Sequence, residues 1–139
     1  MNKVAVIYWS GTGNTQAMAE AVAEGAKAAG ADVSLLTCAE VSGAAAYDAV
    51  ALGCPAMGAE ELEESEFLPM LEGIEPALPG KKVALFGSYG WGDGEWMRSW
   101  EARCAEKGIT LAAASVMANE APDDGVLAAC SALGAELAK

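Results

Sequence analysis

Three short segments of the chain carry residues suited to binding chemistry, and the first of them runs from Trp9 to Thr15. It offers three hydroxyls, one amide and two glycines, but no lysine or arginine. Backbone N–H groups at the start of a helix attract an anion, nearby hydroxyls add donors, and glycines let the backbone wrap closely. The segment therefore predicts a phosphate site, although a loop of this composition is often only a helix cap. The residues predicted to form the site are Ser10, Gly11, Thr12, Gly13, Asn14 and Thr15.

The same segment lacks the signatures of two common phosphate ligands. An ATP-binding loop ends in Gly-Lys-Ser/Thr, whereas this segment ends in Thr15-Gln16-Ala17. A dinucleotide loop needs a third glycine, and Gln16 stands in its place. We therefore expect neither ATP nor NAD.

The second segment, Cys54 to Glu61, is apolar for six residues and then acidic. The thioether of Met57 is polarisable and adaptable, which suits contact with a flat aromatic surface, unless Met57 folds back into the core. The acidic run is either a solvated face or a docking patch for a basic partner. Its members are Glu60, Glu61, Glu63, Glu64 and Glu66.

The third segment, Gly87 to Gly94, places aromatic residues among glycines. Trp91 has glycine on both sides and belongs to no apolar stripe, which favours stacking on a planar ring. Trp96 and Trp100 lie four residues apart on the predicted helix that follows, so we expect both in the core. Asp93 is predicted to cap that helix.

The composition limits the classes of function. A chain of 139 residues, 53% of them hydrophobic, fits one domain over 1–139 and excludes disorder as its main state. No apolar run approaches the roughly 18 residues of a membrane span, and we expect a cytoplasmic protein. A net charge of −12 disfavours nucleic acid and anionic membranes and attracts a basic protein, unless it serves only solubility. A monomer is the default expectation.

The cysteines give no sign of a metal site. Cys38, Cys54, Cys104 and Cys130 are scattered, and the chain has no histidine. The usual spacings of zinc and iron–sulfur ligands are therefore missing. We expect free, buried thiols and no metal.

Hydrophobic patterning predicts strands alternating with helices. Such alternation indicates a parallel sheet with helices on both faces, and ligands bind beyond the carboxyl ends of its strands. The loops after the first, third and fourth strands are the three segments described above. The predicted strands are 4–8, 32–36, 49–53, 82–87 and 110–116, and the predicted helices are 14–29, 40–46 (weak), 63–72, 95–107 and 124–139.

The chain resembles the short-chain, clostridial-type flavodoxins along its whole length. The resemblance rests on Ser-Gly-Thr-Gly-Asn-Thr at 10–15, Ala-Met-Gly at 56–58, Gly-Ser-Tyr-Gly-Trp-Gly at 87–92, and Asn119-Glu120 followed by Pro122-Asp123. It implies an α/β fold, a flavodoxin-like three-layer sandwich with a five-stranded parallel sheet of order 2-1-3-4-5. It also implies a low-potential one-electron carrier of anaerobic metabolism, not an enzyme. Such a carrier shuttles non-covalently bound FMN between semiquinone and hydroquinone and meets redox partners with basic docking faces.

The resemblance also assigns roles to residues. Residues 10–15 hold the FMN phosphate, Met57 covers one face of the isoalloxazine, and Trp91 stacks on the other. The Gly58 carbonyl contacts flavin N5 in the one-electron-reduced state, Glu60 binds near N3, and Asn119 lies near the ribityl chain. Some relatives carry an acid where this chain has Ala59, which leaves the redox potentials open. The remaining predicted contacts are Ala56, Ser88, Tyr89, Gly90 and Gly92.

Two other functions occur on the same architecture. An FMN-dependent quinone reductase needs a second pocket, usually built from longer loops or a dimer interface, and no insertion of that kind is obvious. It remains the alternative. A phosphorelay receiver needs acids after the first strand and a phosphate-accepting aspartate after the third. Tyr8-Trp9 and Gly53-Cys54 occupy those positions, which excludes it.

Overall fold

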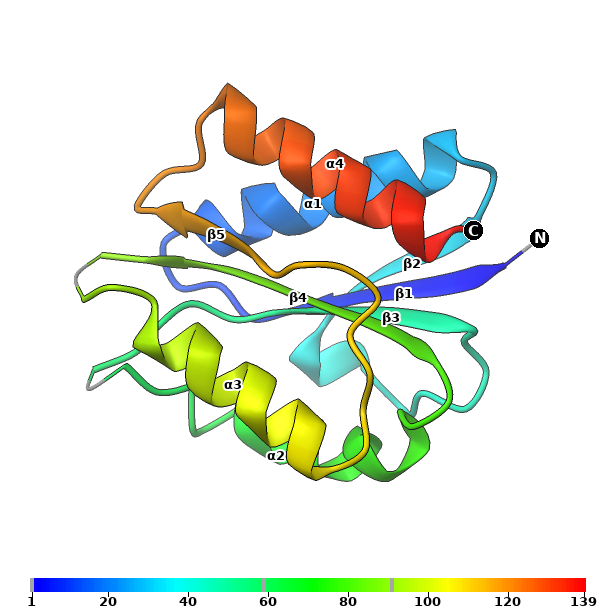
Figure 1. The fold of residues 1–139 in the computed structure, drawn as a ribbon, viewed down its shortest axis with the longest axis horizontal. Helices are drawn as coiled ribbons and strands as arrows, with labels where there is room; N and C mark the ends of the chain where they lie inside the picture. The colour runs from blue at the N-terminus through cyan, green and yellow to red at the C-terminus, as the bar shows by residue number, and fades with distance from the viewer. Residues whose placement is uncertain (1, 59, 91) are drawn as a thin grey trace.

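Five parallel strands form the centre of the molecule (Figure 1). The computed structural model describes residues 2–58, 60–90 and 92–139, and in it the strands follow the order β2-β1-β3-β4-β5. They are β1 (Lys3–Tyr8), β2 (Asp32–Thr37), β3 (Ala49–Gly53), β4 (Lys82–Tyr89) and β5 (Val116–Asn119). The strand order confirms the predicted fold. β1 and β3 are therefore the two neighbouring parallel strands at which the order of the strands across the sheet reverses.

Helices cover both faces of this sheet. Figure 1 shows α1 (Asn14–Ala28) and α4 (Asp124–Leu137) on one face, and α2 (Phe67–Ile74) and α3 (Glu95–Glu106) on the other. Two short 3-10 turns, η1 (Cys38–Glu40) and η2 (Glu75–Ala77), complete the described elements. Gly30 follows α1 in the left-handed region, with φ +96°. In the described part of the chain, every helix is too short or too polar to cross a bilayer.

The core contains the aromatic residues that the sequence assigns to it. Trp96 and Trp100 are 1% and 2% exposed, and the Trp100 ring meets Phe67 edge-on with centroids 5.5 Å apart. All four cysteines are described, buried and free, as predicted. Burial raises the pKa of Cys54 and of Cys130 to about 12, so both thiols pack as small apolar groups.

The helix predicted over 63–72 is wrong at its start. The side chain of Glu63 accepts backbone N–H groups from Ser65, Glu66 and Phe67 at 3.0, 2.7 and 2.8 Å. Residues 63–66 therefore form a capping turn, and α2 begins only at Phe67. The carboxylate supplies the acceptors that the first helical N–H groups lack within the helix.

The weak helix predicted over 40–46 is also wrong. Thr37 and Glu40 form a capping box around the single turn η1, which ends at Glu40. Gly43 then has φ +150°, which a helix cannot accommodate. The chain crosses from β2 to β3 through extended residues and a turn closed by the Tyr47 N–H on Ala44 O at 3.1 Å.

The fifth strand lies further along the chain than the predicted 110–116. Leu111 makes only an isolated bridge to Val83, and Val116–Asn119 pair with Phe86–Tyr89. The intervening run of alanines has a low strand preference, and the Ser115 hydroxyl donates to Glu101 Oε2 on α3 at 2.7 Å. These two effects keep residues 112–115 out of the sheet.

Asp93 does not cap α3, contrary to the prediction. The N-cap position is held by Gly94 with φ +94°. The Asp93 carboxylate instead accepts from Arg98 at 2.9 Å.

Candidate functional site

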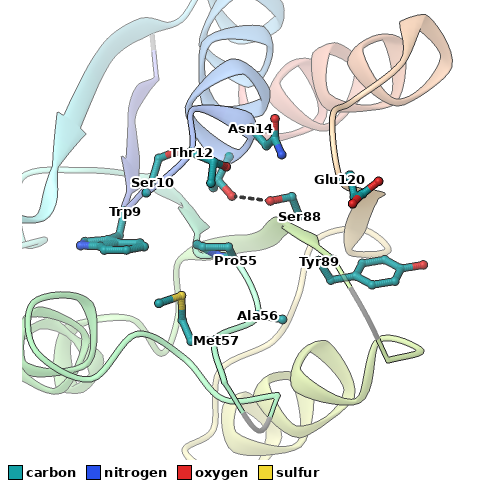
Figure 2. Close-up of a pocket in the computed structure, with 13 residues that line it drawn as sticks. Trp9, Ser10, Thr12, Asn14, Pro55, Ala56, Met57, Ser88, Tyr89 and Glu120 are labelled. Atoms are coloured by element: carbon teal, nitrogen blue, oxygen red, sulfur yellow. Dashed lines mark hydrogen bonds between the residues drawn. The ribbon is translucent and has the colours of Figure 1, made fainter.

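A cavity of about 330 Å³ lies at the carboxyl edge of the sheet, between the loops that follow β1, β3 and β4 (Figure 2). Ligands of open α/β sheets bind beyond the carboxyl ends of the strands, at the point where the strand order reverses. The cavity stands at that point, and its volume lies within the range of small-molecule sites, roughly 300–1,000 Å³. The three segments singled out by their composition therefore meet around one space.

One end of the cavity is lined by hydroxyl and amide groups at the start of α1. Ser10, Thr12 and Asn14 are brought there by the loop that links β1 to the helix (Figure 2). The Gly13 N–H donates to Ser10 Oγ at 3.0 Å, so the Ser10 hydroxyl hydrogen is still available to a guest. Gly13 itself is the N-cap of α1 with φ +98°, a conformation that favours glycine.

A buried hydroxyl pair joins this loop to β4. Thr15 Oγ1 and Ser88 Oγ are 3.2 Å apart, and the two residues are 1% and 5% exposed (Figure 2). Both line the cavity. The contact couples the position of the hydroxyl-rich loop to the strand that carries the aromatic loop.

The other end of the cavity is apolar. Trp9, Pro55, Met57 and Tyr89 surround it, with Ala56 between Pro55 and Met57 (Figure 2). The indole N–H of Trp9 donates to Glu66 Oε1 at 3.1 Å, which holds the ring at the cavity wall. A wall of aromatic, proline and thioether groups suits a flat ring system.

The turn from Met57 to Glu61 has an unusual backbone. Met57 and Glu61 exchange two backbone hydrogen bonds of 2.8 and 3.0 Å, which closes the turn tightly. Within it Gly58 has φ +46° and Glu60 has φ +57°. Left-handed backbone is strained for a non-glycine residue such as Glu60, and strain of this kind gathers at functional sites.

The side chain of Glu60 is held against the loop after β4. Its carboxylate occupies the space that a side chain at Gly92 would fill. The buried Oε1 atom of Glu60 has no hydrogen-bond partner among the described residues. Buried carboxylate oxygens are nearly always partnered, so a donor from a bound group is the natural complement.

The charge of the site is negative or neutral. Among its described lining residues none is a lysine or arginine, and Glu120 contributes a carboxylate. Glu120 has φ +59°, and its N–H donates to Tyr89 O at 2.7 Å. An anion at the hydroxyl end must therefore be held by dipoles and hydrogen bonds, as the sequence indicates.

Most of the predicted binding residues line the cavity. Those that do are residues 10–12, 14, 15, 56, 57 and 88–90. Gly13, Gly58, Glu60 and Gly92 lie in the same loops but outside the lining, and Asn119 is exposed at the end of β5 while its neighbour Glu120 lines the space. Trp91, predicted to stack on a planar ring, and Ala59, noted as a departure from the family pattern, lie outside the described residues.

Three lining residues were not predicted: Trp9, Pro55 and Glu120. Trp9 follows β1 and directly precedes the Ser-Gly-Thr-Gly loop, so its place at the carboxyl end of a predicted strand was the available signal. Glu120 follows β5 at the same edge of the sheet as the other loops. Pro55 carries no such signal, because only the fold shows that it faces the cavity.

Comparisons with known proteins agree on one family. The family model described as flavodoxin matches residues 6–134. A flavodoxin of Megasphaera elsdenii is 48% identical over 98% of both chains, and one of Clostridium beijerinckii is 47% identical over 86% of this chain and 88% of its own. The solution structure of two-electron reduced Megasphaera elsdenii flavodoxin superposes with a TM-score of 0.88 at 46% identity, covering 97% of this chain and 98% of that one.

These relatives decide between the two functions that the sequence leaves open. Flavodoxins match nearly the whole chain, which supports an electron-transfer protein over a quinone reductase. The predicted family, fold and cofactor are confirmed. The chain belongs to the flavodoxin family, the small FMN-dependent electron carriers.

Proposed function

We propose that the cavity at the carboxyl edge is where this carrier holds FMN, with the phosphate at the hydroxyl end and the isoalloxazine at the apolar end. The observation that carries the proposal is the division of one cavity into these two ends at the β1/β3 switch point. Flavodoxin-like folds are themselves a known instance of binding at that point. Glu60 Oε1, which has no partner in the part of the chain that the structure describes, further fits a ring that presents an N–H group.

In this proposal the chain binds the phosphate without a cation. The N–H groups at the start of α1 and the hydroxyls of Ser10 and Thr12 donate to it, and the helix dipole favours its charge. Thr15 and Ser88 hold the loop in place through their mutual contact. Met57 packs against one ring face, and the resemblance gives the other to Trp91.

When bound, FMN supplies a ring system that takes up and gives away single electrons. The protein around it disfavours added negative charge, because Glu120 lines the cavity and the chain carries a net charge of −12. An electron held in such surroundings is passed on readily. The residues of the chain therefore tune the carrier toward a strong reductant.

Flavodoxins work with redox partner proteins. We further propose that this carrier is a cytoplasmic monomer and that its partner presents a basic face to the acidic run 60–66. Glu61, Glu64 and Glu66 are exposed there. Met57 lines the cavity, and its backbone is hydrogen-bonded to the backbone of Glu61. A partner on this run would therefore stand next to the cofactor.

One experiment tests the cofactor site. FMN released by acid from the purified protein should be identified by mass at one per chain, and an adenine-containing flavin would overturn the proposal. Thr12→Ala should then weaken FMN binding by removing one donor to the phosphate, about 1 kcal/mol or fivefold in Kd. Thr110→Ala is the matched control, because Thr110 is exposed and lies outside the three loops around the cavity. It should leave Kd unchanged.

A second experiment tests the docking face. Electron transfer to a basic partner protein should slow as salt rises, because at physiological ionic strength charges more than about 8 Å apart are largely screened. Glu61→Gln with Glu64→Gln should reduce both the rate at low salt and its salt dependence. Glu20→Gln with Glu24→Gln removes the same charge from α1, on the other face of the sheet (Figure 1), and should change the rate less. Equal effects of the two pairs would show that only net charge matters.

A further inference from the structure

Trp96, at the start of α3, contacts two of the three chain segments that form the cofactor cavity. It is 1% exposed and is not among the described residues that line the cavity. Its indole N–H donates to Cys54 O at 3.1 Å, and Cys54 directly precedes the cavity residues 55–57. Its ring lies 5.5 Å from the ring of Tyr89, measured between centroids, and Tyr89 lines the cavity at the end of β4. One buried side chain therefore joins the loop after β3 to the end of β4.

The Cys54 carbonyl depends on this indole for its hydrogen bond. The Cys54 N–H extends the pairing of β3 with β4 by donating to Phe86 O at 3.2 Å. Its carbonyl oxygen, by contrast, lies 2.2 Å from where a Cβ on Gly87 would stand. Because Cβ atoms point away from the plane of a sheet, this oxygen lies off that plane. No described backbone N–H donates to it, so Trp96 is its one donor within the described residues.

Gly87 makes room for the contact. Its missing Cβ would lie 3.2 Å from Trp96 Cζ2 as well as 2.2 Å from Cys54 O, so the indole and the carbonyl meet over the glycine. A side chain at this position would push the two groups apart. The first glycine of the segment 87–94 therefore serves a close approach between α3 and the loop after β3.

The hydrogen bond fixes the start of a segment whose other contacts lead to the cavity wall. The Ala56 N–H donates to Ser88 O at 3.0 Å, and Met57 and Glu61 exchange two backbone bonds. A buried carbonyl that loses its donor costs about 1–3 kcal/mol. The segment can lower that cost only by moving at Cys54, and such a movement carries the apolar wall at Met57 with it.

We propose that Trp96 is a positioning residue for the flavin ring, and that it holds both sides of the apolar end through the Cys54 carbonyl and the Tyr89 ring. The inference rests on the proposed function, which assigns the ring to that end of the cavity. Trp100, one helical turn further along α3, is 2% exposed, and no described residue accepts from its indole N–H. It is therefore the matched control for lost volume.

The first test measures binding of three probes to the apoprotein: FMN, riboflavin, which lacks the phosphate, and inorganic phosphate, which lacks the ring. In Trp96→Phe the segment relaxes, and ring binding must restore its position at the expense of the lost hydrogen bond. FMN and riboflavin should therefore bind about threefold to tenfold more weakly, with phosphate unchanged. Trp100→Phe should leave all three affinities unchanged. Equal weakening in the two variants, or a loss for phosphate as large as for riboflavin, would overturn the proposal.

Thr12→Ala distinguishes failure of this inference from failure of the proposed cofactor site. It removes a donor at the hydroxyl end, so it should weaken FMN and phosphate and leave riboflavin unchanged. If Thr12→Ala has this effect while Trp96→Phe leaves riboflavin binding intact, only the role of Trp96 is wrong. If neither variant alters FMN binding, the proposed site and the inference fail together.

A second variant keeps the size of the ring and removes only the donor. Trp96→3-benzothienylalanine places a sulfur where the indole N–H stands and retains the bicyclic ring beside Tyr89. Riboflavin should again bind about threefold to tenfold more weakly. An affinity equal to that of the wild type would contradict a role for the N–H.

The apoprotein also supplies a readout that needs no flavin. Amide hydrogen exchange at Ala56 and Met57 reports local opening of the segment, because both N–H groups are hydrogen-bonded in it. Exchange at these two amides should be about threefold to tenfold faster in both Trp96 variants than in Trp100→Phe. Equal exchange rates in all three would show that Trp96 does not hold the segment, and the proposal would be wrong.

Discussion

The two faces of the sheet are filled by different means. Between α1 and α4 the packing relies on small residues, and two glycines bring the backbones together: a Cβ on Gly25 would strike the Ser131 carbonyl, and one on Gly134 would strike that of Val22. Beneath α2 and α3 the space is filled by Phe67, Trp96 and Trp100. The first face is closed by backbone contact, and the second by large side chains.

Polar groups sharpen the contrast. The α2/α3 face buries the Glu63 cap, the Glu75 carboxylate that pairs with Arg103, and two indole N–H groups, one of them without an acceptor among the described residues. This face also borders the acidic run 60–66. The buried core of the α1/α4 face is built mainly from small apolar residues, whereas the α2/α3 face must also satisfy buried polar groups.

Gly134→Ala should have the largest effect on stability. The new Cβ would lie 2.8 Å from Ala26 N and closer still to the Val22 carbonyl, both backbone atoms that cannot give way unless the helices separate. We expect the free energy of unfolding to fall by about 3 kcal/mol. Gly73→Ala, in α2, is the matched control, since nothing lies within 4 Å of its Cβ. It should gain roughly 0.5–1 kcal/mol. Urea unfolding of both variants checks the pair, and equal losses would contradict a tighter α1/α4 contact.

Trp91→Ala should show that a third tryptophan serves the cofactor and not the α2/α3 core. From the sequence argument we expect Trp91→Ala to weaken FMN binding by about 1–3 kcal/mol, roughly fivefold to 150-fold in Kd. Fluorescence titration of the apoprotein with FMN measures this. A collapse of the apoprotein's thermal stability would instead make Trp91 a core residue like Trp96 and Trp100.

The layered fold and the location of the site follow from the sequence because both depend on local patterns. Apolar runs mark β1, β3 and β4, and the segments after them, two rich in glycine and one apolar and then acidic, mark the functional edge. β5 does not follow, because residues 110–114 continue the apolar pattern of a strand, and the hydrogen bond from Ser115 to α3 that helps to keep the run out of the sheet is a tertiary contact. The start of α2 does not follow either, because Glu63 reads as a helix former and acts as a cap.

The site is predicted less completely than the fold, for a physical reason. Loop residues with distinctive chemistry, such as Thr12 and Met57, are visible in the sequence and line the cavity. Pro55 lines it only because of the path of the chain. The sequence gives no sign that the Trp100 N–H has no acceptor among the described residues, since Trp96 lies on the same helix face and its N–H is hydrogen-bonded.

Glu63→Gln tests the α2/α3 face through pH. Burial alone would raise the pKa of Glu63, but hydrogen bonds from Ser65, Phe67 and Glu66 outweigh it and hold the pKa at about 2, below the unfolded value of 4.5. A depressed folded pKa contributes stability above the unfolded value and loses it as pH falls from 4.5 toward 2. The variant should lose about 1–2 kcal/mol at pH 7, as for a lost cap, and the difference from wild type should shrink through that acid window. Glu72→Gln, exposed on α2, is the control, and a pH-independent difference would contradict the role of the charge.

The smallest effect should separate the two buried tryptophans of α3. Trp96→Phe and Trp100→Phe remove the same volume from the same core, so their packing losses largely cancel in the comparison. Trp96→Phe also leaves the buried Cys54 carbonyl without its donor, which the structure gives at 3.1 Å. Trp100→Phe removes an N–H that no described residue accepts. Leaving a buried partner unsatisfied costs about 1–3 kcal/mol, whereas deleting an unpaired donor removes a penalty. The free energy of unfolding should therefore fall further in Trp96→Phe, by about 1–2 kcal/mol.

Urea unfolding at saturating FMN measures the difference. FMN affinity is determined for both variants, because the Trp96 ring lies 5.5 Å from the ring of the cavity residue Tyr89, measured between centroids. Equal losses would mean that the Trp100 N–H already has an acceptor in the free protein, and the contrast between the two faces would then not extend to this buried donor.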